Sequence, residues 1–318
     1  MLSGKDWIFL QKNNPALIGY FEMVAGCLPA GQILLNEPMS RHTTFEIGGP
    51  ADCMVLPASP EQTAAVLLLV AEQTWPLTVI GKGSNLLVRD KGIRGLVLKI
   101  GDSMAHLRCE GETIVAGAGA LLADVARFAA ECELTGLEFA EGIPGSIGGA
   151  VFMNAGAYDG EISGLVAQVT AVGPDGTVRV YSANELFFDY RQSVFQSNHC
   201  VICEVRLKLN KGDRDRVESL MSELRRRRAS KQPLEWPSAG STFRRPPGHF
   251  AGTLVELAGC KGLCCGDAIV SEKHAGFIVN AGKASAAEVQ ELIRNVQQRV
   301  KMKTGVDLWP EVVILGEE

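Results

Sequence analysis

The chain has 318 residues, which exceeds what one ordinary hydrophobic core needs and suits two or three domains. Its composition, 46% hydrophobic and 21% charged, is typical of a soluble globular protein and argues against intrinsic disorder. The net charge of −5 argues against a general attraction to nucleic acid or to anionic membranes. Glycine is in excess, because 35 glycines among 318 residues exceed the usual share of about 7%.

The N-terminus and the cysteine content predict a cytoplasmic protein without a membrane segment. Lys12 and the polar residues beside it interrupt the apolar run that a signal peptide needs. No apolar stretch elsewhere approaches the roughly 18 residues that span a bilayer. Nine cysteines without a secretory signal are typical of reduced thiols in a cytosol rather than of a disulfide framework.

Two cysteine clusters raise the alternatives of a redox pair or a zinc site. Cys200 and Cys203 form a C-x-x-C, but they lie in an apolar run typical of a strand. A redox pair needs a helix N-terminus to lower the thiol pKa, and a strand offers none. Cys260, Cys264 and Cys265 lack the usual spacing of paired zinc ligands. We therefore predict buried structural thiols and no metal site.

The first 40 residues are predicted to form a helical lead-in, and short strands alternate with a few helices from residue 43 to residue 209. Ser59-Pro60-Glu61-Gln62 is a typical helix start, with a serine cap, a proline in the first turn and a glutamine three residues after the cap. We expect that helix to run to Glu72. Strands are then predicted at residues 77–80, 86–88 and 96–100, and a helix at residues 121–132.

Residues 213–228 are predicted to form an amphipathic helix whose apolar face comprises Val217, Leu220, Met221 and Leu224. The basic run Arg225–Arg228 at its end is interpreted as a solvated face that complements the helix dipole, in preference to a phosphate clamp. Two prolines between residues 231 and 237 then indicate a domain boundary.

The remaining residues contain one clearly delimited helix. Ser285 and Glu288 form a capping box at its start, and Gly305 ends it. The predicted buried face consists of Val289, Leu292, Ile293, Val296 and Val300. The chain is predicted to close on a strand at residues 311–315.

The segment Gly81–Asn85 lies between two predicted strands and does not match the common phosphate-binding motifs. Pro76 stands where a Walker A loop needs its first glycine, and Gly83 stands where that loop needs Ser or Thr. A Rossmann fingerprint needs a helix after the glycines, but Leu86–Val88 is strand-like. What remains is an ordinary turn or a nest of backbone N–H groups that binds an anion.

Two further glycine-rich segments favour the second interpretation. Ala116–Gly119 ends a predicted strand, and the stretch from Gly142 to Gly156 combines glycines with apolar residues, so it is not a flexible linker. Apolar residues anchor such a loop, while glycines let its backbone lie against a flat or phosphorylated ligand. Three such loops close together in the sequence predict a large cofactor.

Seven short motifs follow one another in an order that is specific to one family. They are His42–Phe45 with Ile47–Asp52, Gly81–Val88, Gly142–Tyr158, Tyr190–Phe195, Ala239–Phe243, Val270–His274 and Pro310–Val312. In these motifs the chain resembles the UDP-N-acetylenolpyruvoylglucosamine reductases, also called UDP-N-acetylmuramate dehydrogenases, from about residue 41 to residue 316. It resembles their shorter branch, because no segment matches the extra tyrosine-bearing loop of the other branch.

The resemblance implies an α+β fold with a lead-in at residues 1–40, a two-lobed FAD-binding domain of the vanillyl-alcohol-oxidase type (PCMH-like) at 41–230, and a smaller α+β substrate domain at 231–318. It implies NADPH-dependent reduction of UDP-N-acetylglucosamine enolpyruvate to UDP-N-acetylmuramate through noncovalent FAD, in cytoplasmic peptidoglycan synthesis for the cell wall. No metal, nucleic acid or membrane is implied. The residues implied to bind FAD are Gly81, Gly83, Ser84, Asn85, Leu86, Gly119, Ile143, Pro144, Gly145, Gly148, Gly149 and Gly156.

Three residues match the catalytic positions of the family. Hydride addition to C3 of the enolpyruvyl group places negative charge on C2 and the carboxylate, so the site needs a cation and a proton donor. By resemblance, Arg191 binds the carboxylate, Glu311, if protonated through burial, donates a hydrogen bond to the enolate, and Ser241 protonates C2. After Ser241 the chain lacks the lysine-asparagine-proline run of many members, so Arg244 and Arg245 are candidates for binding the substrate diphosphate.

Two other functions remain open from the sequence. A flavin oxidase of the same superfamily would share the FAD domain, but it frequently binds flavin covalently and would not require the contexts of Ser241 and Glu311. A non-catalytic nucleotide-binding or zinc-binding protein would need none of Arg191, Ser241 and Glu311.

Overall fold

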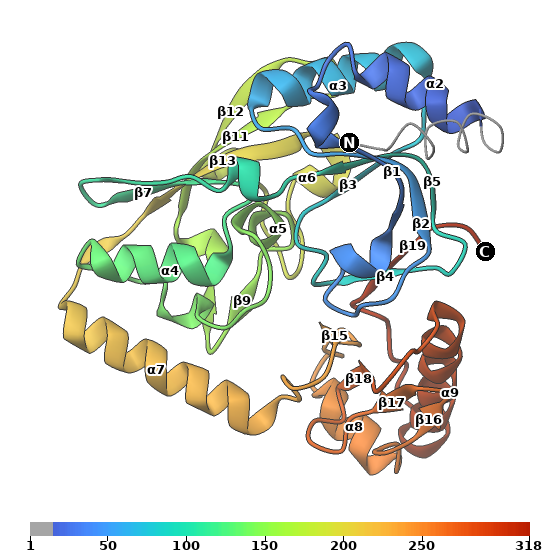
Figure 1. Cartoon of the computed structure of the whole chain (residues 1–318). Helices are drawn as coiled ribbons and strands as arrows, with labels where there is room; N and C mark the ends of the chain where they lie inside the picture. The colour runs from blue at the N-terminus through green and yellow to red at the C-terminus, as the bar shows by residue number, and fades with distance from the viewer. Residues whose placement is uncertain (1–14) are drawn as a thin grey trace. The chain divides into compact units, whose positions relative to one another are not determined.

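The computed structural model describes residues 15–318, and the chain forms two compact units (Figure 1). Unit 1 comprises the described residues up to Asn36 together with Asp52–Lys82 and Gly95–Arg226, and unit 2 comprises Glu37–Ala51, Gly83–Arg94 and Arg227–Glu318. Each unit is therefore assembled from segments that are far apart in the sequence. The predicted lead-in lies partly outside the described residues, and the domain limits proposed at residues 40 and 230 stay a prediction.

A four-stranded sheet in unit 1 has the strand order β1-β2-β5-β3. Strand β3 runs parallel to β5, and helix α2 (Pro15–Val24) packs on helix α3 (Pro60–Gln73), with the rings of Tyr20 and Trp75 4.4 Å apart. The strands of this sheet are β1 (Ile33–Pro38), β2 (Pro50–Val55), β3 (Leu77–Ile80) and β5 (Ile93–Lys99).

The start of α3 is confirmed as predicted from the sequence. The Ser59 side-chain oxygen accepts a hydrogen bond from the N–H of Gln62 at 3.2 Å, and Thr74 ends the helix in a left-handed conformation with φ of 51°. The buried residues of α3 include Val66 and Leu67, which join the same apolar core as Leu96 of β5. Burial of this face, rather than helix propensity, holds α3 on the sheet.

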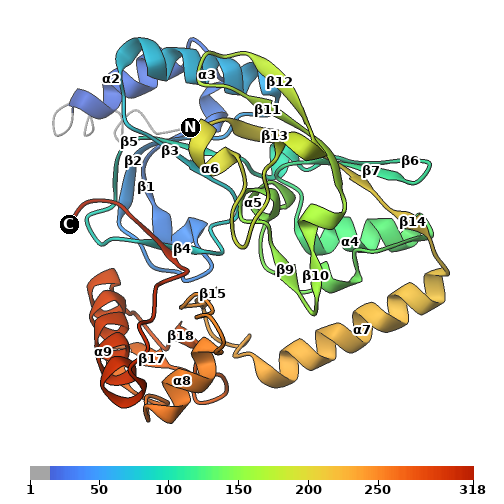
Figure 2. The same ribbon diagram turned by 180° about the vertical axis from the view of Figure 1, so that it is seen from behind.

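The second sheet of unit 1 is antiparallel and has the order β12-β11-β13-β7-β6 (Figure 2). Its central strand, β13, buries five of its eight residues, and the helix predicted at residues 121–132 is confirmed as α4. The strands are β6 (Leu107–Glu110), β7 (Thr113–Gly117), β11 (Val166–Val172), β12 (Val178–Ser182) and β13 (Val201–Lys208), and the helices of this region are α4 (Leu122–Glu131), α5 (Ile147–Phe152) and α6 (Phe195–Asn198).

Short elements complete unit 1. A hairpin joins β9 (Gly156–Ala157) to β10 (Gly160–Glu161), and β8 (Leu134–Thr135) pairs with β14 (Asn210–Lys211). Single 3₁₀ turns occur along the chain at Ala30–Gln32, Met39–His42, Asp102–Met104, Glu138–Ala140, Ile162–Gly164 and Ala183–Glu185. Among the described residues no helix has the length and apolar character needed to cross a membrane.

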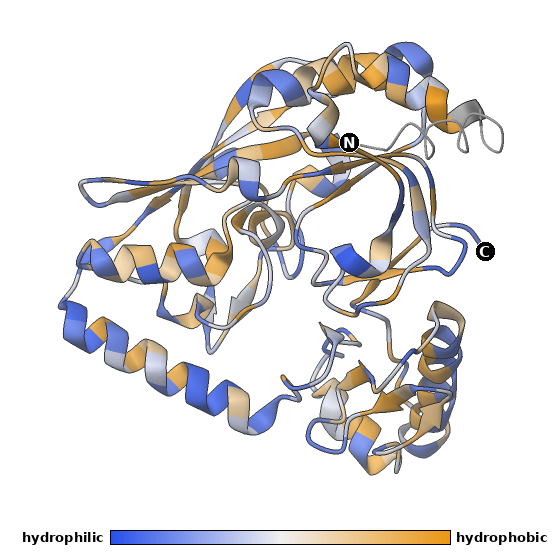
Figure 3. Cartoon of the chain, viewed as in Figure 1, coloured by the Kyte–Doolittle hydropathy of each residue, from blue (hydrophilic) through white to orange (hydrophobic). Residues whose placement is uncertain are grey.

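Helix α7 (Arg214–Lys231) confirms the predicted amphipathic helix, with two exceptions. Val217, Met221 and Leu224 are buried, but Leu220 is 43% exposed, so the predicted apolar face was one residue too wide. The interpretation of the basic run as a solvated face is wrong for Arg228, which is only 5% exposed. The rest of the helix surface is mostly hydrophilic (Figure 3).

Unit 2 contains an antiparallel sheet with the order β15-β18-β17-β16. Helix α9 packs on both β16 and β17, and its capping box, buried face and glycine end are all confirmed. The strands are β15 (Ser238–Ser241), β16 (Cys264–Cys265), β17 (Ala268–Val270) and β18 (Phe277–Asn280), and the helices are α8 (Ala251–Leu257) and α9 (Ala286–Thr304).

A parallel pair of short strands fastens the C-terminal end of the chain within unit 2. Strand β19 (Val313–Leu315) runs beside β4 (Leu86–Val88), the strand that directly follows the first glycine loop. The predicted final strand is confirmed, although it begins two residues later than expected. The segment after the first glycine loop and the end of the chain thus form one local structure.

The cysteine prediction is confirmed in part. Cys200, Cys203 and Cys260 are buried, but on the edge strand β16 Cys264 is exposed and Cys265 is half-buried. Burial raises the pKa of the Cys203 thiol to about 12, which keeps it protonated at neutral pH. Within residues 15–318 no group of three or more His, Cys, Asp or Glu side chains is placed to hold a metal ion. That zinc is not bound stays a prediction.

The capping box of α9 gives a first testable prediction. Ser285 accepts a hydrogen bond from the N–H of Glu288 at 3.2 Å, and the Glu288 carboxylate accepts one from the N–H of Ser285 at 2.8 Å. Ser285→Ala should lower the free energy of unfolding by about 1 kcal/mol, measured by urea denaturation. Ser219→Ala, on the exposed side of α7, is the control and should change it by less than about 0.5 kcal/mol. Equal stability of the Ser285 variant and the wild type would contradict the prediction.

Candidate functional site

The first glycine loop, Gly81–Asn85, leaves β3 and enters β4, and the chain passes from unit 1 to unit 2 within it. The five backbone N–H groups of this loop find no acceptor among the described residues. Consecutive N–H groups without a protein acceptor favour an anion, because they supply partial positive charge without a side chain. This donor set suits a diphosphate, and FAD contains one.

Gly83 is required by the packing of the loop itself. Its φ is 72°, and a Cβ at this position would lie 2.0 Å from the carbonyl oxygen of His42. The carbonyl of Gly83 also accepts a hydrogen bond from the N–H of Thr44 at 3.3 Å. The sequence interpretation attributed the glycine to close approach of a ligand, whereas the structure shows that it permits close approach of the 42–44 segment.

The second glycine loop is pressed against the segment that contains Gly119. The N–H of Ile147 donates to the carbonyl of Ala120 at 2.8 Å, and the N–H of Gly148 donates to that of Ala118 at 2.9 Å. A Cβ on Gly148 would lie 2.8 Å from the Cβ of Ala118, and one on Gly119 would lie 1.9 Å from the carbonyl oxygen of Gly101. These two glycines are therefore needed for backbone packing.

Gly156 is also a glycine because of backbone packing. A Cβ on it would lie 2.7 Å from the carbonyl oxygen of Gly160, its neighbour across the β9–β10 hairpin. Its predicted contact with FAD, like those of Leu86, Ile143, Pro144 and Gly145, stays a prediction that the packing neither requires nor excludes.

Gly149 differs from these glycines because its missing side chain borders open space. It is exposed, and the nearest atom to a Cβ built on it is the Ser146 Oγ at 3.5 Å. The Ser146 Oγ accepts a hydrogen bond from the N–H of Gly149 at 3.4 Å and so fixes the turn. A ligand can approach this backbone directly. The two glycine loops therefore fit the expected cofactor. The first offers backbone N–H donors without a protein acceptor, and the second offers an exposed glycine backbone.

Arg191 lies beside the second glycine loop in unit 1. Its Nη1 donates a hydrogen bond to the carbonyl of Asn154 at 3.4 Å, and its guanidinium carbon lies 4.9 Å from the centre of the Tyr190 ring. The backbone of Arg191 is left-handed, with φ of 56°, and Gln196 holds its carbonyl at 2.9 Å. A non-glycine residue in that conformation is sustained only where its surroundings fix it, and such residues cluster at functional sites.

Asn154 was not predicted as a site residue, and the structure gives it a central part in this loop. It is 2% exposed and left-handed, and its amide nitrogen donates to the carbonyl of Asp189 at 3.1 Å. Its amide oxygen accepts from the N–H of Ser163 at 3.2 Å. Asn154 thus joins the glycine loop to the segment that carries Arg191. The sequence feature that could have identified Asn154 is its position in the third motif, Gly142–Tyr158.

In unit 2 the structure brings three predicted residues, Asn85, Ser241 and Glu311, close along the backbone. The N–H of Glu311 donates to the carbonyl of Thr242, the residue after Ser241, at 2.8 Å. The amide nitrogen of Asn85 donates to the carbonyl of Glu311 at 3.2 Å, and the N–H of Val313 donates to the carbonyl of Asn85 at 2.9 Å. Glu311 is half-buried, so its protonation through burial stays a prediction.

His274 borders Ser241, and no role was predicted for it. A Cβ on Gly276 would lie 3.0 Å from the Cε1 of His274 and 3.5 Å from the Oγ of Ser241, so both side chains flank this glycine. The Nδ1 of His274 accepts a hydrogen bond from the N–H of Gly276 at 3.1 Å, which places the proton of the neutral ring on Nε2. Burial lowers the pKa of His274, which favours that neutral form.

Arg244 and Arg245 are both exposed in unit 2. The backbone N–H of Arg244 donates to the carbonyl of Trp309 at 2.8 Å, and the guanidinium carbon of Arg245 lies 4.1 Å from the centre of the exposed Phe250 ring. Which of the two arginines binds a diphosphate stays a prediction.

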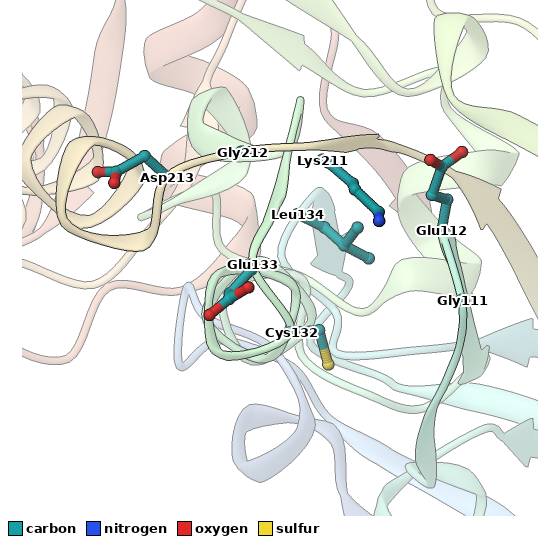
Figure 4. Close-up of a pocket in the computed structure, with 8 residues that line it drawn as sticks. All are labelled: Gly111, Glu112, Cys132, Glu133, Leu134, Lys211, Gly212 and Asp213. Atoms are coloured by element: carbon teal, nitrogen blue, oxygen red, sulfur yellow. The ribbon is translucent and has the colours of Figure 1, made fainter.

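A cavity of about 670 Å³ in unit 1 lies outside this set of residues (Figure 4). None of the residues predicted for catalysis or FAD binding lines it. Glu112, Glu133 and Asp213 give it an acidic character, with Lys211 as the only basic residue of the lining. A net negative lining does not suit a diphosphate, so this cavity is not the candidate site.

Two family models match successive parts of the chain. Residues 51–182 match the FAD binding domain, and residues 232–315 match the C-terminal domain of UDP-N-acetylenolpyruvoylglucosamine reductase. Among similar curated proteins, the UDP-N-acetylenolpyruvoylglucosamine reductase of Syntrophomonas wolfei is 47% identical over 92% of this chain and 97% of its own length. The protein of the same name from Clostridium botulinum is 47% identical over 94% of this chain and 96% of its own.

Solved structures agree with these matches. The UDP-N-acetylenolpyruvylglucosamine reductase (MurB) of Thermus caldophilus has a TM-score of 0.77 and 35% identity, over 89% of this chain and 98% of that one. The glucose dehydrogenase Phl p 4.0202 has a TM-score of 0.50 at 13% identity, over 62% of this chain and 44% of that one. The second likeness concerns the fold alone, and together with the family match it confirms the predicted FAD-binding fold.

The open space beside Gly149 gives a prediction that separates ligand binding from folding. Gly149→Ala should keep the stability of the FAD-free protein but weaken FAD binding by about tenfold or more, since a Cβ would occupy ligand space. Gly148→Ala is the matched control and should instead lower the stability by about 1–3 kcal/mol, because its Cβ would meet Ala118. Flavin fluorescence titration and thermal unfolding measure the two effects. Unchanged FAD affinity in Gly149→Ala would place the cofactor elsewhere.

Proposed function

Because this chain belongs to the UDP-N-acetylenolpyruvoylglucosamine reductase family, we propose that it reduces UDP-N-acetylglucosamine enolpyruvate to UDP-N-acetylmuramate with electrons from NADPH. The observation that carries this proposal is the 47% identity to a reductase of that name over 92% of the chain. The product is a precursor of peptidoglycan, and the reaction takes place in the cytoplasm.

FAD binds noncovalently to the two glycine loops. Bound FAD supplies the hydride that passes from NADPH to C3 of the enolpyruvyl group. The N–H groups of Gly81–Asn85 balance the charge of its diphosphate, and the open backbone at Gly149 lets the cofactor lie against the second loop. Because these donors belong to the backbone, they stay fixed whatever the redox state of the cofactor.

Arg191 binds the carboxylate of the enolpyruvyl group. Hydride addition at C3 moves negative charge onto C2 and this carboxylate, and a guanidinium stabilises that charge by bidentate hydrogen bonds. The hydrogen bond to Asn154 and the hold of Gln196 on its carbonyl limit its motion before substrate binds. A cation that is already oriented stabilises the transition state more than one that must first be oriented, because orienting it costs free energy.

Ser241 gives its hydroxyl proton to C2, and Glu311, in its protonated form, donates a hydrogen bond to the developing enolate. A serine hydroxyl is a weak acid, so it acts only because the carbanion at C2 is a strong base and the hydroxyl is held in place. Ser241 pairs with Phe277 across the β15–β18 ladder. It lies next to an irregularity in the strand register, and such irregularities change the direction of the neighbouring side chains. The bond between the N–H of Glu311 and the carbonyl of Thr242 ties both groups to one backbone frame.

The oxidase alternative shares only the fold of the FAD domain. The glucose dehydrogenase with a similar fold is 13% identical and matches 62% of the chain, whereas the reductase matches include residues 232–315, the part with Ser241 and Glu311. No observation favours oxidase activity over reduction of an enolpyruvyl group.

Noncovalent binding of the flavin is directly testable. We expect acid precipitation of the purified protein to release all of its flavin into the supernatant, where absorbance near the flavin maximum measures it. The physical reason is that hydrogen bonds from backbone N–H groups are lost when the protein unfolds, while a covalent bond is not. Flavin retained on the precipitated protein would support the oxidase alternative.

The proton donor gives a prediction for each half-reaction. Ser241→Ala should allow NADPH to reduce the flavin at nearly the normal rate, because that step needs no proton at C2. Reoxidation of the reduced flavin by the enolpyruvyl sugar nucleotide should slow by more than the ~10²- to 10⁴-fold typical of general acid catalysis, because an unprotonated carbanion returns its hydride. Stopped-flow absorbance follows both steps.

Ser238→Ala, at the other end of the same strand, is the control and should leave both steps unchanged. Equal slowing of both half-reactions in Ser241→Ala would show that this residue shapes a shared binding site. Unchanged reoxidation would place the proton donor elsewhere.

A further inference from the structure

Glu141 stands directly before the second glycine loop and is almost entirely inside unit 1. Its side chain is 4% exposed, and its Oε1 lies 2.7 Å from the Nη2 of Arg225 on α7, whose side chain is 56% exposed. This ion pair is therefore buried at the carboxylate end and solvated at the guanidinium end. Glu141 is also held by its backbone, since its N–H donates to the carbonyl of Glu138 at 3.2 Å.

The second carboxylate oxygen of Glu141 has no donor. Oε2 is buried and accepts no hydrogen bond from any of the described residues. A buried acceptor without a donor has given up its hydrogen bonds to water without replacement, and the cost is larger when the group carries charge. Native proteins rarely leave such a group without a partner, so the donor is expected to come from outside the chain.

The same turn of α7 also holds the far end of the loop. The hydroxyl of Tyr158, in the turn between β9 and β10, donates to the carbonyl of Leu224 at 3.4 Å. Both views of the molecule show this hairpin and α7 side by side (Figures 1 and 2). Leu224 and Arg225 of α7 thus contact the residues on either side of the 142–156 loop, Tyr158 after it and Glu141 before it.

We propose that Glu141 is a cofactor-positioning residue, whose Oε1 is held by Arg225 and whose Oε2 accepts a hydrogen bond from an N–H or O–H donor of bound FAD. The inference rests on the proposed function, since it takes FAD as the ligand of the 142–156 loop. FAD carries donors of both kinds, on its ring system, on its ribityl chain and on its adenosine. Arg225, placed by sequence in a solvated basic run, acquires a role through Glu141.

The test compares Glu141→Gln with the wild type in the full-length protein. Glutamine keeps the volume and one acceptor for Arg225, but it turns an N–H group toward the donor. We expect the dissociation constant of FAD, measured by fluorescence titration of the FAD-free protein, to rise about 10- to 100-fold, the loss of a hydrogen bond to a charged group. The thermal stability of the FAD-free variant should stay at the wild-type value.

Arg225→Met should weaken FAD binding as well, because Oε1 loses its partner and the carboxylate is no longer oriented. Arg226→Met is the matched control on the neighbouring exposed position and should leave FAD affinity unchanged. If Glu141→Gln folds poorly, the pair of arginine variants still tests the proposal, since Arg225 forms an ion pair with Glu141 and Arg226 occupies the neighbouring exposed position. Equal affinity of the Arg225 and Arg226 variants would overturn it.

Two further readouts locate the donor and exclude a merely structural role. A raised reduction potential of the flavin in Glu141→Gln places the donor on the ring system, because a nearby negative charge disfavours the reduced anion. A matching loss of ADP affinity places it on the adenosine half, and loss of FAD affinity alone places it on the ribityl chain. Unchanged FAD affinity, or destabilisation of the FAD-free protein alone, overturns the inference in favour of a buried water. Failure of the wild type to bind FAD would instead refute the proposed function.

Discussion

The arrangement of unit 1 depends on a contact between two stretches of backbone that have no side chains between them. Residues 145–148 lie against residues 118–122 through three hydrogen bonds, and Gly148 and Ala118 approach so closely that one more carbon atom does not fit. Because that contact fixes the start of the second glycine loop, it also fixes Ser146, which turns Gly149 outward. The exposed backbone at Gly149 thus depends on the close backbone contact at Gly148, and both positions need glycine.

In unit 2, backbone hydrogen bonds hold together the segments that carry the two proposed catalytic residues, Ser241 and Glu311. Asn85, Thr242 and Glu311 are linked by hydrogen bonds to backbone carbonyls, so displacement of one segment moves the others. Asn85 and Glu311 are 226 residues apart in the sequence, yet a single amide group joins them. The first glycine loop and the Ser241 segment are therefore not independent parts of the protein.

Local signals in the sequence predicted most of the secondary structure. The caps at Ser59 and Ser285, and strands β3 and β4, were placed correctly because each depends on residues that are neighbours in the chain. Burial of Arg228 and exposure of Leu220 were missed, since periodicity describes a helix without its surroundings. The interleaving of residues 37–51 and 83–94 with the C-terminal unit leaves no local signal at all.

The site shows the same division. Motifs pointed to the glycine loops and to Arg191, Ser241 and Glu311, but not to the reasons for individual glycines. Gly83 and Gly148 are glycines because other backbone segments approach them, and only three-dimensional contact reveals this. Glu141 and Asn154 were missed because a single Glu or Asn has no sequence signature of burial, although both lie in or beside the third motif.

The parallel pairing of β4 with β19 has a consequence for how the protein is made. Leu86 pairs with Val313, so among the described residues the strand after the first glycine loop has no partner strand until the segment that contains Val313 has left the ribosome. During synthesis the edge of that strand stays unpaired, and unpaired strand edges can associate with other chains. Closing such a long loop is also slow. The pairing of β4 within unit 2 is thus expected to form only after the segments of unit 1 up to Arg226 have been synthesised.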